Sequence, residues 1–137
     1  MITPENLNQY WTDIYFHLHY THKEKVTHQV VRILQLVEKR ENVGIAEIAT
    51  YLNVSPNTAS EHVKRSIEKG YLYKKRDQKD ERKVVLGLTE FGVEILQRNT
   101  SLDEAKLEKL FENFDEEEKY LIEKAFKLLS ENAKQCM

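Results

Sequence analysis

The chain has 137 residues, of which 40% are hydrophobic and 32% charged, and its formal net charge is −2. This length favours a single domain with one core, and the composition is typical of a soluble globular protein. The small net charge excludes a uniformly basic nucleic-acid binder but allows a basic face. No signal peptide or membrane span is visible, and the single cysteine, Cys136, has no partner in the chain. We therefore expect a reduced, cytoplasmic protein without membrane contacts.

The first half of the chain has the apolar periodicity of amphipathic helices. A first helix is expected to run to about Tyr20, Thr27 is a plausible N-cap for a second, and a short third helix should span residues 45–52. The apolar positions are Leu7, Tyr10, Trp11, Ile14, Tyr15 and Leu18 in the first helix, Val30, Ile33, Leu34 and Val37 in the second, and Ile45, Ile48, Ala49 and Leu52 in the third.

A fourth helix is predicted from its start and stop signals. Ser55 can cap its N-terminus, Pro56 occupies the first helical position, and Gly70 is placed to end it in a left-handed conformation. The residues expected to face the core, at four-residue steps, are Ala59, Val63 and Ile67.

After Gly70 the apolar period changes to two, which indicates a β-hairpin. Leu72 begins one strand and residues 84–88 form its partner, after which Thr89 can cap a long fifth helix. The apolar positions of that helix include Phe91, Ile95, Leu102, Leu107, Leu110 and Phe114.

A last helix is predicted from Asp115 and Glu118, which have the spacing of a capping box. The order of elements predicts a fold that is mainly α with a small β-hairpin wing. This is a winged helix-turn-helix flanked by N- and C-terminal helices.

Polar residues lie on the predicted solvent side of the fourth helix. A helix that reads DNA needs a buried side and a polar side with small and basic residues near its N-terminus. Asn, Ser and Thr can meet base edges or phosphates, and Lys and Arg can neutralise phosphates. Because most exposed helices have a polar face, the pattern does not by itself identify a DNA-reading helix. The candidates are Ser55, Asn57, Thr58, Ser60, Glu61, Lys64 and Arg65.

Positive charge is concentrated between Glu61 and Lys83. This stretch has nine Lys or Arg and five acidic residues, a net charge of +4, so the remainder carries −6. Such segregation is what a phosphate-contacting surface requires. The alternative is a solvated hairpin tip whose charges only prevent edge-to-edge pairing.

The hairpin sequence resembles a known family. RDQKDERKVVLG (76–87) followed by LTEFG (88–92) is similar to the wing and following helix start of the MarR family of bacterial transcription regulators. VTHQVVRIL (26–34), EIATYLNVS (47–55) and TASEHVKRSIEKGYL (58–72) resemble that family's second, third and fourth helices. The resemblance covers nearly the whole chain. Its wing motif is specific, whereas the helix-turn-helix part is shared with many other regulators.

The resemblance implies a role for the charged hairpin tip. In this family the Arg matching Arg82 enters the minor groove, and the acid matching Asp80 orients it by an ion pair. A narrow A·T-rich minor groove concentrates negative potential, which favours an Arg there. Arg76 and Lys79 would add phosphate contacts.

Three positions depart from the family pattern. Glu61 and Glu81 stand where a basic residue is common, and Ser66 stands where Leu is usual. Glu61 could instead accept a hydrogen bond from a cytosine amino group. With Ser66 in place of Leu, we expect the helix to pack more through Ile67.

Apolar side chains near both termini exceed what this small domain needs for its own core. They are Trp11, Tyr15 and Leu18 at one end and Leu121, Ala125, Phe126 and Leu129 at the other. The resemblance adds that these helices interlock into a homodimer, with recognition helices about one DNA turn, ~34 Å, apart. We therefore expect one MarR-like domain over residues 1–137, with dimerisation helices at 5–25 and 96–137 and a DNA-binding lobe at 27–95. Packing of both helices within the monomer is the alternative.

Ligand and metal sites were considered separately. Many family members release DNA when a small, often phenolic, compound binds between the dimer helices and the DNA-binding lobe. The residues on the helix that would line such a site are Trp11, Tyr15, Phe16 and His19. No pair among His17, His19, His22 and His28 has the i, i+4 spacing that two ligands on one helix prefer, so no metal or cofactor is predicted. Related redox regulators carry their sensing cysteine in the first helix, so Cys136 is expected to be inert.

No catalytic constellation is visible, so we expect a regulator rather than an enzyme. The prediction is a homodimeric transcription regulator, most simply a repressor, that binds a pseudo-palindromic double-stranded DNA operator. Two alternatives stay open: a winged helix used only for protein–protein contacts, and a zinc-type metal-dependent regulator of the same fold.

Overall fold

The computed structural model describes residues 1–136 and divides the chain into two compact units. The winged-helix unit is His19–Ser101, and the terminal-helix unit is Met1–Leu18 together with the chain from Leu102 onward. The winged-helix unit therefore includes the loop before α2 and all of α5, and is longer than the expected range 27–95. No described helix is long and apolar enough to cross a membrane.

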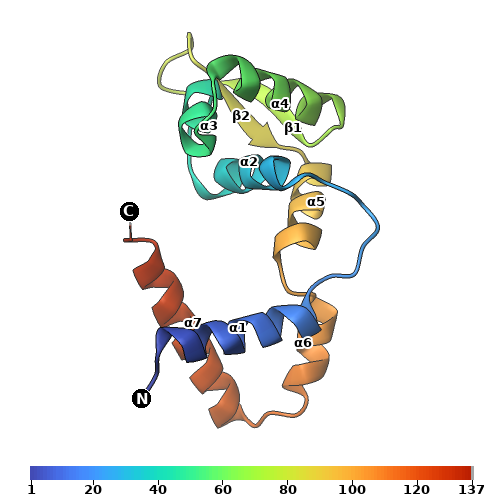
Figure 1. The fold of residues 1–137 in the computed structure, drawn as a ribbon, viewed down its shortest axis with the longest axis vertical. Helices are drawn as coiled ribbons and strands as arrows, with labels where there is room; N and C mark the ends of the chain where they lie inside the picture. The colour runs from blue at the N-terminus through green and yellow to red at the C-terminus, as the bar shows by residue number, and fades with distance from the viewer. Residues whose placement is uncertain (137) are drawn as a thin grey trace. The chain divides into compact units, whose positions relative to one another are not determined.

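The winged-helix unit contains four helices and a two-stranded hairpin (Figure 1). Its fold is the predicted winged helix-turn-helix. The elements are α2 (His28–Lys39), α3 (Ile45–Leu52), α4 (Pro56–Glu68), β1 (Leu72–Arg76), β2 (Val84–Leu88) and α5 (Glu90–Thr100).

Three of the predicted helix caps are confirmed in this unit. The side-chain oxygens of Thr27, Ser55 and Thr89 each accept a hydrogen bond from a backbone N–H three residues later. Each cap satisfies one of the donors that a helix N-terminus otherwise leaves free.

The core of the winged-helix unit is formed where α2, α3, α4, α5 and the base of the hairpin meet. The strands are antiparallel, with Leu72 opposite Leu88 and Arg76 opposite Val84. The unit is stabilised by burial of apolar side chains, which recur in the sequence at helical spacing in the helices and at every second residue in the strands. The largest fully buried apolar side chains are Ile33, Leu34, Ile48, Val63, Leu72, Val85, Ile95 and Leu96.

The turn after α4 fixes where α5 begins. Gly70 has a φ of +83°, the left-handed conformation predicted for it. The Thr89 hydroxyl donates to the carbonyl oxygens of Gly70 and Tyr71. A side chain on Gly92 would place its Cβ only 2.1 Å from the Tyr71 oxygen, so α5 can approach this turn only with glycine at that position.

The terminal-helix unit consists of α1 (Pro4–Leu18), α6 (Glu104–Phe111) and α7 (Glu116–Ala133). The end of α1 is joined to the start of α6, because the Asp103 N–H donates to the Leu18 oxygen at 2.7 Å. The predicted capping box of Asp115 and Glu118 is present at the start of α7. None of the three helices has a buried residue.

The long fifth helix expected from Thr89 to Phe114 is wrong, because the chain forms two helices there. The Asn99 amide and the Thr100 hydroxyl donate to the carbonyls of Ile95 and Leu96, both at 2.7 Å, and Ser101 is extended. Such local side-chain bonds compete with helix continuation. Asp103 then caps α6 by accepting from the Ala105 N–H, a second start signal that apolar spacing alone does not reveal.

Candidate nucleic-acid interface

The inner face of α4 packs on the core of the winged-helix unit. Ala59, Val63 and Ser66 are fully buried there, whereas Ile67 is only partly buried. We expected Ile67 to take up packing that Ser66 could not supply, but Ser66 itself is the more deeply buried of the two. Ser66 can be buried because its hydroxyl donates to the His62 carbonyl at 2.9 Å, so no donor is left unsatisfied.

All of the residues predicted to meet DNA from the fourth helix and its N-cap are exposed on the outer side of α4. Ser55 also has a structural task, since its hydroxyl accepts from the Thr58 N–H at 3.1 Å and donates to the Thr58 hydroxyl at 3.0 Å. The contacts of this face with DNA stay a prediction. The exposed candidates are Ser55, Asn57, Thr58, Ser60, Glu61, Lys64 and Arg65.

The tip of the hairpin is a turn held together by Asp77. This residue is buried, its N–H donates to the Lys83 oxygen and its Oδ1 accepts from the Lys79 N–H, both at 2.9 Å. The Lys83 N–H in turn donates to the Asp80 oxygen at 2.9 Å. Asp77 was not among the predicted site residues, although an Asp at the start of a charged turn is a recognised turn signal.

Arg82 extends from this turn into solvent, with 94% of its side chain exposed. Its Nε lies 3.4 Å from Asp80 Oδ1, which also accepts from the Arg82 N–H at 3.1 Å. The ion pair that the resemblance implies is thus present. Arg76 is held against the same turn, where its Nη1 donates to the Glu81 oxygen at 3.4 Å, and Lys79 is exposed.

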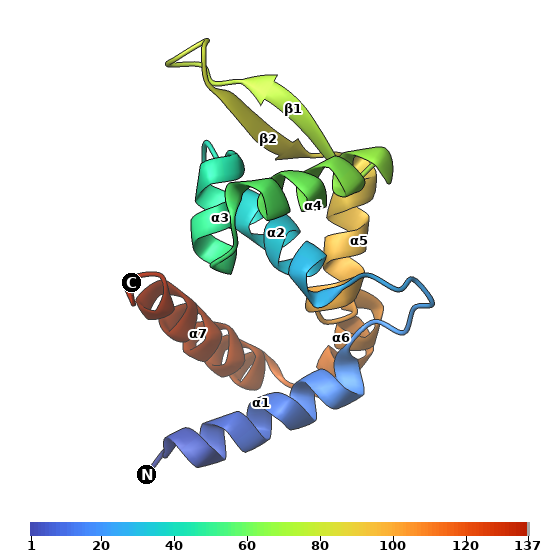
Figure 2. The same ribbon diagram turned by 45° about the horizontal axis from the view of Figure 1, so that its top comes forward.

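A hollow of about 650 Å³ separates α4 from the hairpin, which extends beyond α4 in Figure 2. Ser60 and Lys64 line it from α4, and Tyr73 and Lys74 line it from β1. Its floor is apolar, formed by Ile45, Val63, Ile67, Leu72, Val84 and Leu86. The outer face of α4 and the hairpin therefore border one concave surface.

Charge differs in sign between the two units. The winged-helix unit has 15 Lys or Arg and 11 acidic residues, which gives a net charge of +4. The terminal-helix unit has 6 Lys or Arg and 12 acidic residues, which gives a net charge of −6. The hollow and the hairpin tip lie in the positive unit, as contact with phosphates requires.

A comparison with known proteins gives the family. Residues 17–99, more than half of the chain, match the family described as "Transcriptional regulator SarA/Rot". The chain belongs to the SarA/Rot family. The description of this family is that of a transcriptional regulator, which is the class of protein expected from the sequence.

The SarA/Rot chain is also similar to a curated relative, the HTH-type transcriptional regulator SarZ of Staphylococcus haemolyticus (strain JCSC1435). The two are 25% identical over 97 residues, which is 71% of this chain and 63% of the relative. The match thus spans less than two thirds of the relative's length.

Two solved structures share the fold. Streptococcus pneumoniae FabT in complex with DNA is 21% identical with a TM-score of 0.57, covering 98% of this chain and all of that one. Lactococcus lactis ZitR, a zinc-responsive MarR family member, is 22% identical with a TM-score of 0.52. The match covers 93% of this chain and 96% of that one. The resemblance to the MarR family is confirmed by this common fold and by the family match.

One ion pair in the SarA/Rot chain was missed by the sequence analysis. Lys83 Nζ lies 3.0 Å from Glu47 Oε1, which joins the hairpin to α3. Partial burial by itself would raise the pKa of Glu47, but the hydrogen bond from Lys83 and those from the Glu47 and Gly44 N–H groups lower it below its ordinary value. The same hydrogen bond raises the pKa of Lys83. No local pattern could have paired these residues, because they are far apart in the sequence.

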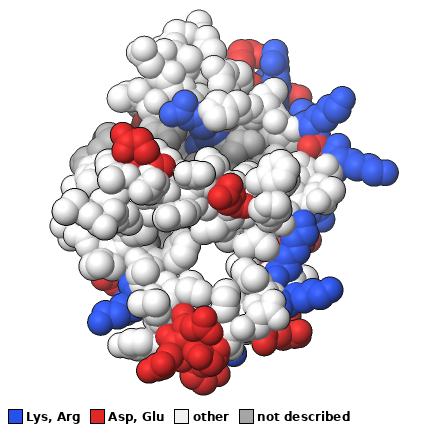
Figure 3. Space-filling model, turned by 60° about the horizontal axis from the view of Figure 1, so that its bottom comes forward, with Lys and Arg blue, Asp and Glu red and all other residues white. Residues whose placement is uncertain are grey.

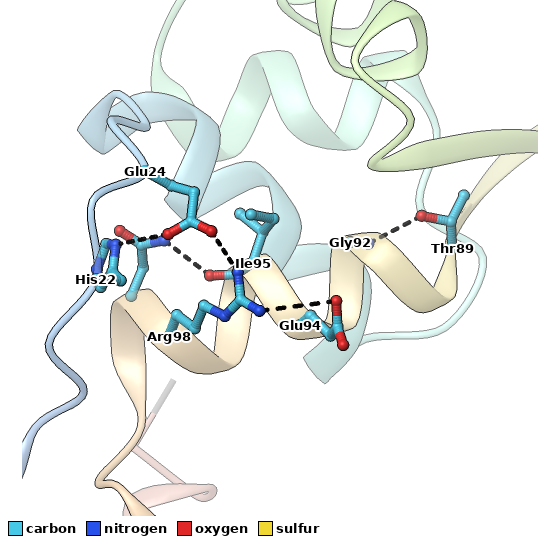
Figure 4. A network of polar contacts seen from close by, with 8 residues as sticks. His22, Glu24, Thr89, Gly92, Glu94, Ile95 and Arg98 are labelled. Carbon is cyan, nitrogen blue, oxygen red and sulfur yellow. Dashed lines mark hydrogen bonds and ion pairs between the residues drawn. The ribbon is translucent and has the colours of Figure 1, made fainter.

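A second polar network holds the loop before α2 against α5 (Figure 4). The Arg98 guanidinium forms an ion pair with Glu24 from the loop. Its Nη2 also lies 4.0 Å from Oε2 of Glu94, which is on the same helix as Arg98. Glu24 Oε2 is also 3.4 Å from His22 Nδ1. The pKa of Glu24 is lowered, first by a backbone N–H bond and then by the charge of Arg98, against the opposing effect of burial. This network lies outside the candidate interface.

The aromatic residues predicted for a ligand site lie in two units. Trp11, Tyr15 and Phe16 are on α1, whereas His19 belongs to the winged-helix unit. Trp11 and Tyr15 have ring centroids 6.3 Å apart, and Phe16 is strongly exposed. A ligand role for these residues stays a prediction.

The histidines and the cysteine add no metal centre to the described chain. Within residues 1–136, no three His, Cys, Asp or Glu side chains are grouped so as to hold a metal ion. Cys136 is exposed, and its thiol donates to the Asn132 carbonyl at 3.6 Å.

Proposed function

We propose that this chain regulates transcription by binding double-stranded DNA, with α4 in the major groove and the hairpin tip in the adjacent minor groove. One observation carries the proposal: Ser60 and Lys64 of α4 and Tyr73 and Lys74 of the hairpin line one hollow in the positively charged unit, and the same hairpin carries the exposed Arg82 at its tip. A major groove about 12 Å wide admits a helix, and a narrow minor groove attracts an Arg.

The five cations proposed to contact DNA are available for phosphates. Lys64, Arg65 and Lys79 form no ion pair with an acidic side chain among residues 1–136, and the single partner of Arg82 is an exposed Asp80. An exposed pair of this kind contributes only about 0–1 kcal/mol, so it leaves the Arg82 guanidinium free to contact DNA as well. Among residues 1–136, Arg76 also has no acidic partner, and its guanidinium donates to the Glu81 backbone oxygen.

We further propose a homodimer formed through the terminal-helix unit. A helix with an apolar stripe must bury it, yet α1, α6 and α7 have no buried residue. Figure 3, in which this unit comes toward the viewer, shows mostly uncharged side chains. A hollow of about 650 Å³ in this unit is lined almost entirely by apolar side chains, among them Ile14, Leu107, Phe111, Ile122 and Phe126.

A second copy of the chain can cover these side chains. Exposed apolar surface of this extent marks an interaction site, and a two-fold dimer presents the same surface on both partners. The strongly exposed apolar residues of α7 are Tyr120, Leu121, Leu128 and Leu129. Repression is then the simplest outcome, because a dimer seated on an operator excludes other proteins from it.

The test is binding of the purified chain to DNA from upstream of its own gene and to a scrambled duplex of equal composition. Binding would be measured by fluorescence anisotropy between about 50 and about 200 mM salt. Five cations on each of two protomers predict a slope of log affinity against log salt approaching about −9. Specific binding of two chains per duplex with a steep slope would support the proposal.

The protein–protein alternative makes the opposite prediction for the same experiment. Weak, equal binding to both duplexes with a shallow slope would contradict DNA recognition. A metal-dependent regulator would lose operator binding in chelator, whereas the proposal expects no change.

A further inference from the structure

The hairpin is attached to the helix-turn-helix at a second place besides its own base. Lys83 is the last residue of the turn, and Glu47 lies in the first turn of α3. Their side chains meet at 3.0 Å, with 46% and 38% of their surfaces exposed. This contact therefore links the tip end of β2 to a helix of the DNA-reading motif.

Two backbone contacts lie beside this ion pair. The Leu86 N–H donates to the Val43 oxygen at 2.8 Å. A Cβ on Gly44 would be 3.0 Å from the Val84 oxygen, so the α2–α3 loop approaches β2 closely. The backbone attachment ends at Val84, and the Glu47–Lys83 pair extends it one residue toward the tip.

Beyond Lys83, the tip is held by bonds within its own turn. These bonds fix the shape of the turn but not its position relative to α4. Glu47 can supply that position, because α3 packs directly against α4. Arg82 is the next residue toward the tip, and adjacent Cα atoms are about 3.8 Å apart.

We infer that Glu47 and Lys83 are a positioning pair, which holds the hairpin tip at the place relative to α4 from which Arg82 enters the minor groove. The inference rests on the proposed function. The pair gives little stability, since exposed ion pairs are weak. Its effect is to fix the position of Arg82 before DNA binds. Without the pair, this side chain has to be ordered during binding, which costs affinity.

Both groups are charged near neutral pH, because the pKa of Glu47 is lowered and that of Lys83 is raised. A competing role for Lys83 is direct contact with a DNA phosphate. In that case Glu47 would weaken binding by neutralising Lys83, and its removal would strengthen binding. The two roles therefore predict opposite effects for the Glu47 variant.

The experiment compares Glu47→Gln, Lys83→Met and the exchanged pair Glu47→Lys with Lys83→Glu. Lys75→Met is the matched control, since Lys75 is an exposed hairpin lysine without an acidic partner among the described residues. Affinity is measured for operators with A·T-rich and with G·C-rich flanks. Both single variants should lose about two- to tenfold in preference for A·T-rich flanks. The exchanged pair should recover it, and the control should keep it.

The inference is overturned if Glu47→Gln leaves the preference unchanged or if the exchanged pair behaves like Lys83→Met. Hydrogen exchange of the hairpin amides without DNA tests the pair independently of the proposed function. Faster exchange over residues 77–83 in Glu47→Gln, but not in Lys75→Met, shows that the pair restrains the tip, and a wild-type chain that binds no DNA would then overturn the proposed function and not this restraint. Equal exchange in all variants contradicts it.

Discussion

Replacing Arg82 by Ala should impair DNA binding while leaving the fold intact. With 94% of its side chain exposed and one ion pair at 3.4 Å, Arg82 adds little to folding, so the free energy of unfolding should change by less than about 0.5 kcal/mol. A specific Arg contact with DNA contributes about 1–3 kcal/mol. The proposed dimer has two such contacts, so affinity should fall by about 2–6 kcal/mol, which is at least about 30-fold.

Three readouts make this prediction specific. Anisotropy with operators that differ only in their flanks should show that Arg82→Ala loses the preference for A·T-rich sequence. The salt slope should become shallower by up to about 2, one unit for each protomer. Asp80→Ala keeps the Arg82 charge but removes its orienting partner, and should reduce the flank preference more than the affinity.

The control is Lys25→Ala, which removes the same charge from the loop before α2, away from α4 and the hairpin (Figures 1 and 2). If Arg82→Ala changes affinity and flank preference no more than Lys25→Ala does, the hairpin tip does not enter the minor groove. The mechanism proposed for this site would then be refuted.

Three further predictions concern stability and assembly. Ser66→Leu should lower the free energy of unfolding by about 1–3 kcal/mol in a denaturant titration, because the site is filled and a larger side chain overpacks it; an increase would show that the core is underpacked there. The pKa of Glu47 is lowered in the folded state, so its contribution is present above the ordinary glutamate value of about 4.3 and is lost as the pH falls through the folded value. The free energy of unfolding of the wild type should therefore exceed that of Glu47→Gln at neutral pH, and the difference should disappear in acid. A difference that persists in acid would contradict the lowered pKa of Glu47. Leu128→Glu, at a side chain that is 63% exposed, should convert dimer to monomer in sedimentation velocity, whereas an unchanged mass would place the dimer interface elsewhere.

The sequence predicted most of the local structure because its signals are local. Ser55, Thr89 and Gly70 each act within one helical turn, so their roles as caps could be inferred from neighbouring residues. The break after Thr100 was missed because the apolar spacing continues through it. Ser66 was misjudged because the burial of a serine depends on whether its hydroxyl has a partner, here the His62 carbonyl.

What the sequence by itself determined is the elements from the first helix to the start of α5, the segregation of +4 charge into one stretch and the hairpin motif that carries Arg82. These follow from periodicity, capping and composition, which act over a few residues. Only the tertiary structure decided that α4 and the hairpin border one hollow, and that Lys83 meets Glu47. Those contacts join residues distant in the chain, and folding brings them together because burial of a common apolar core fixes the elements that carry them.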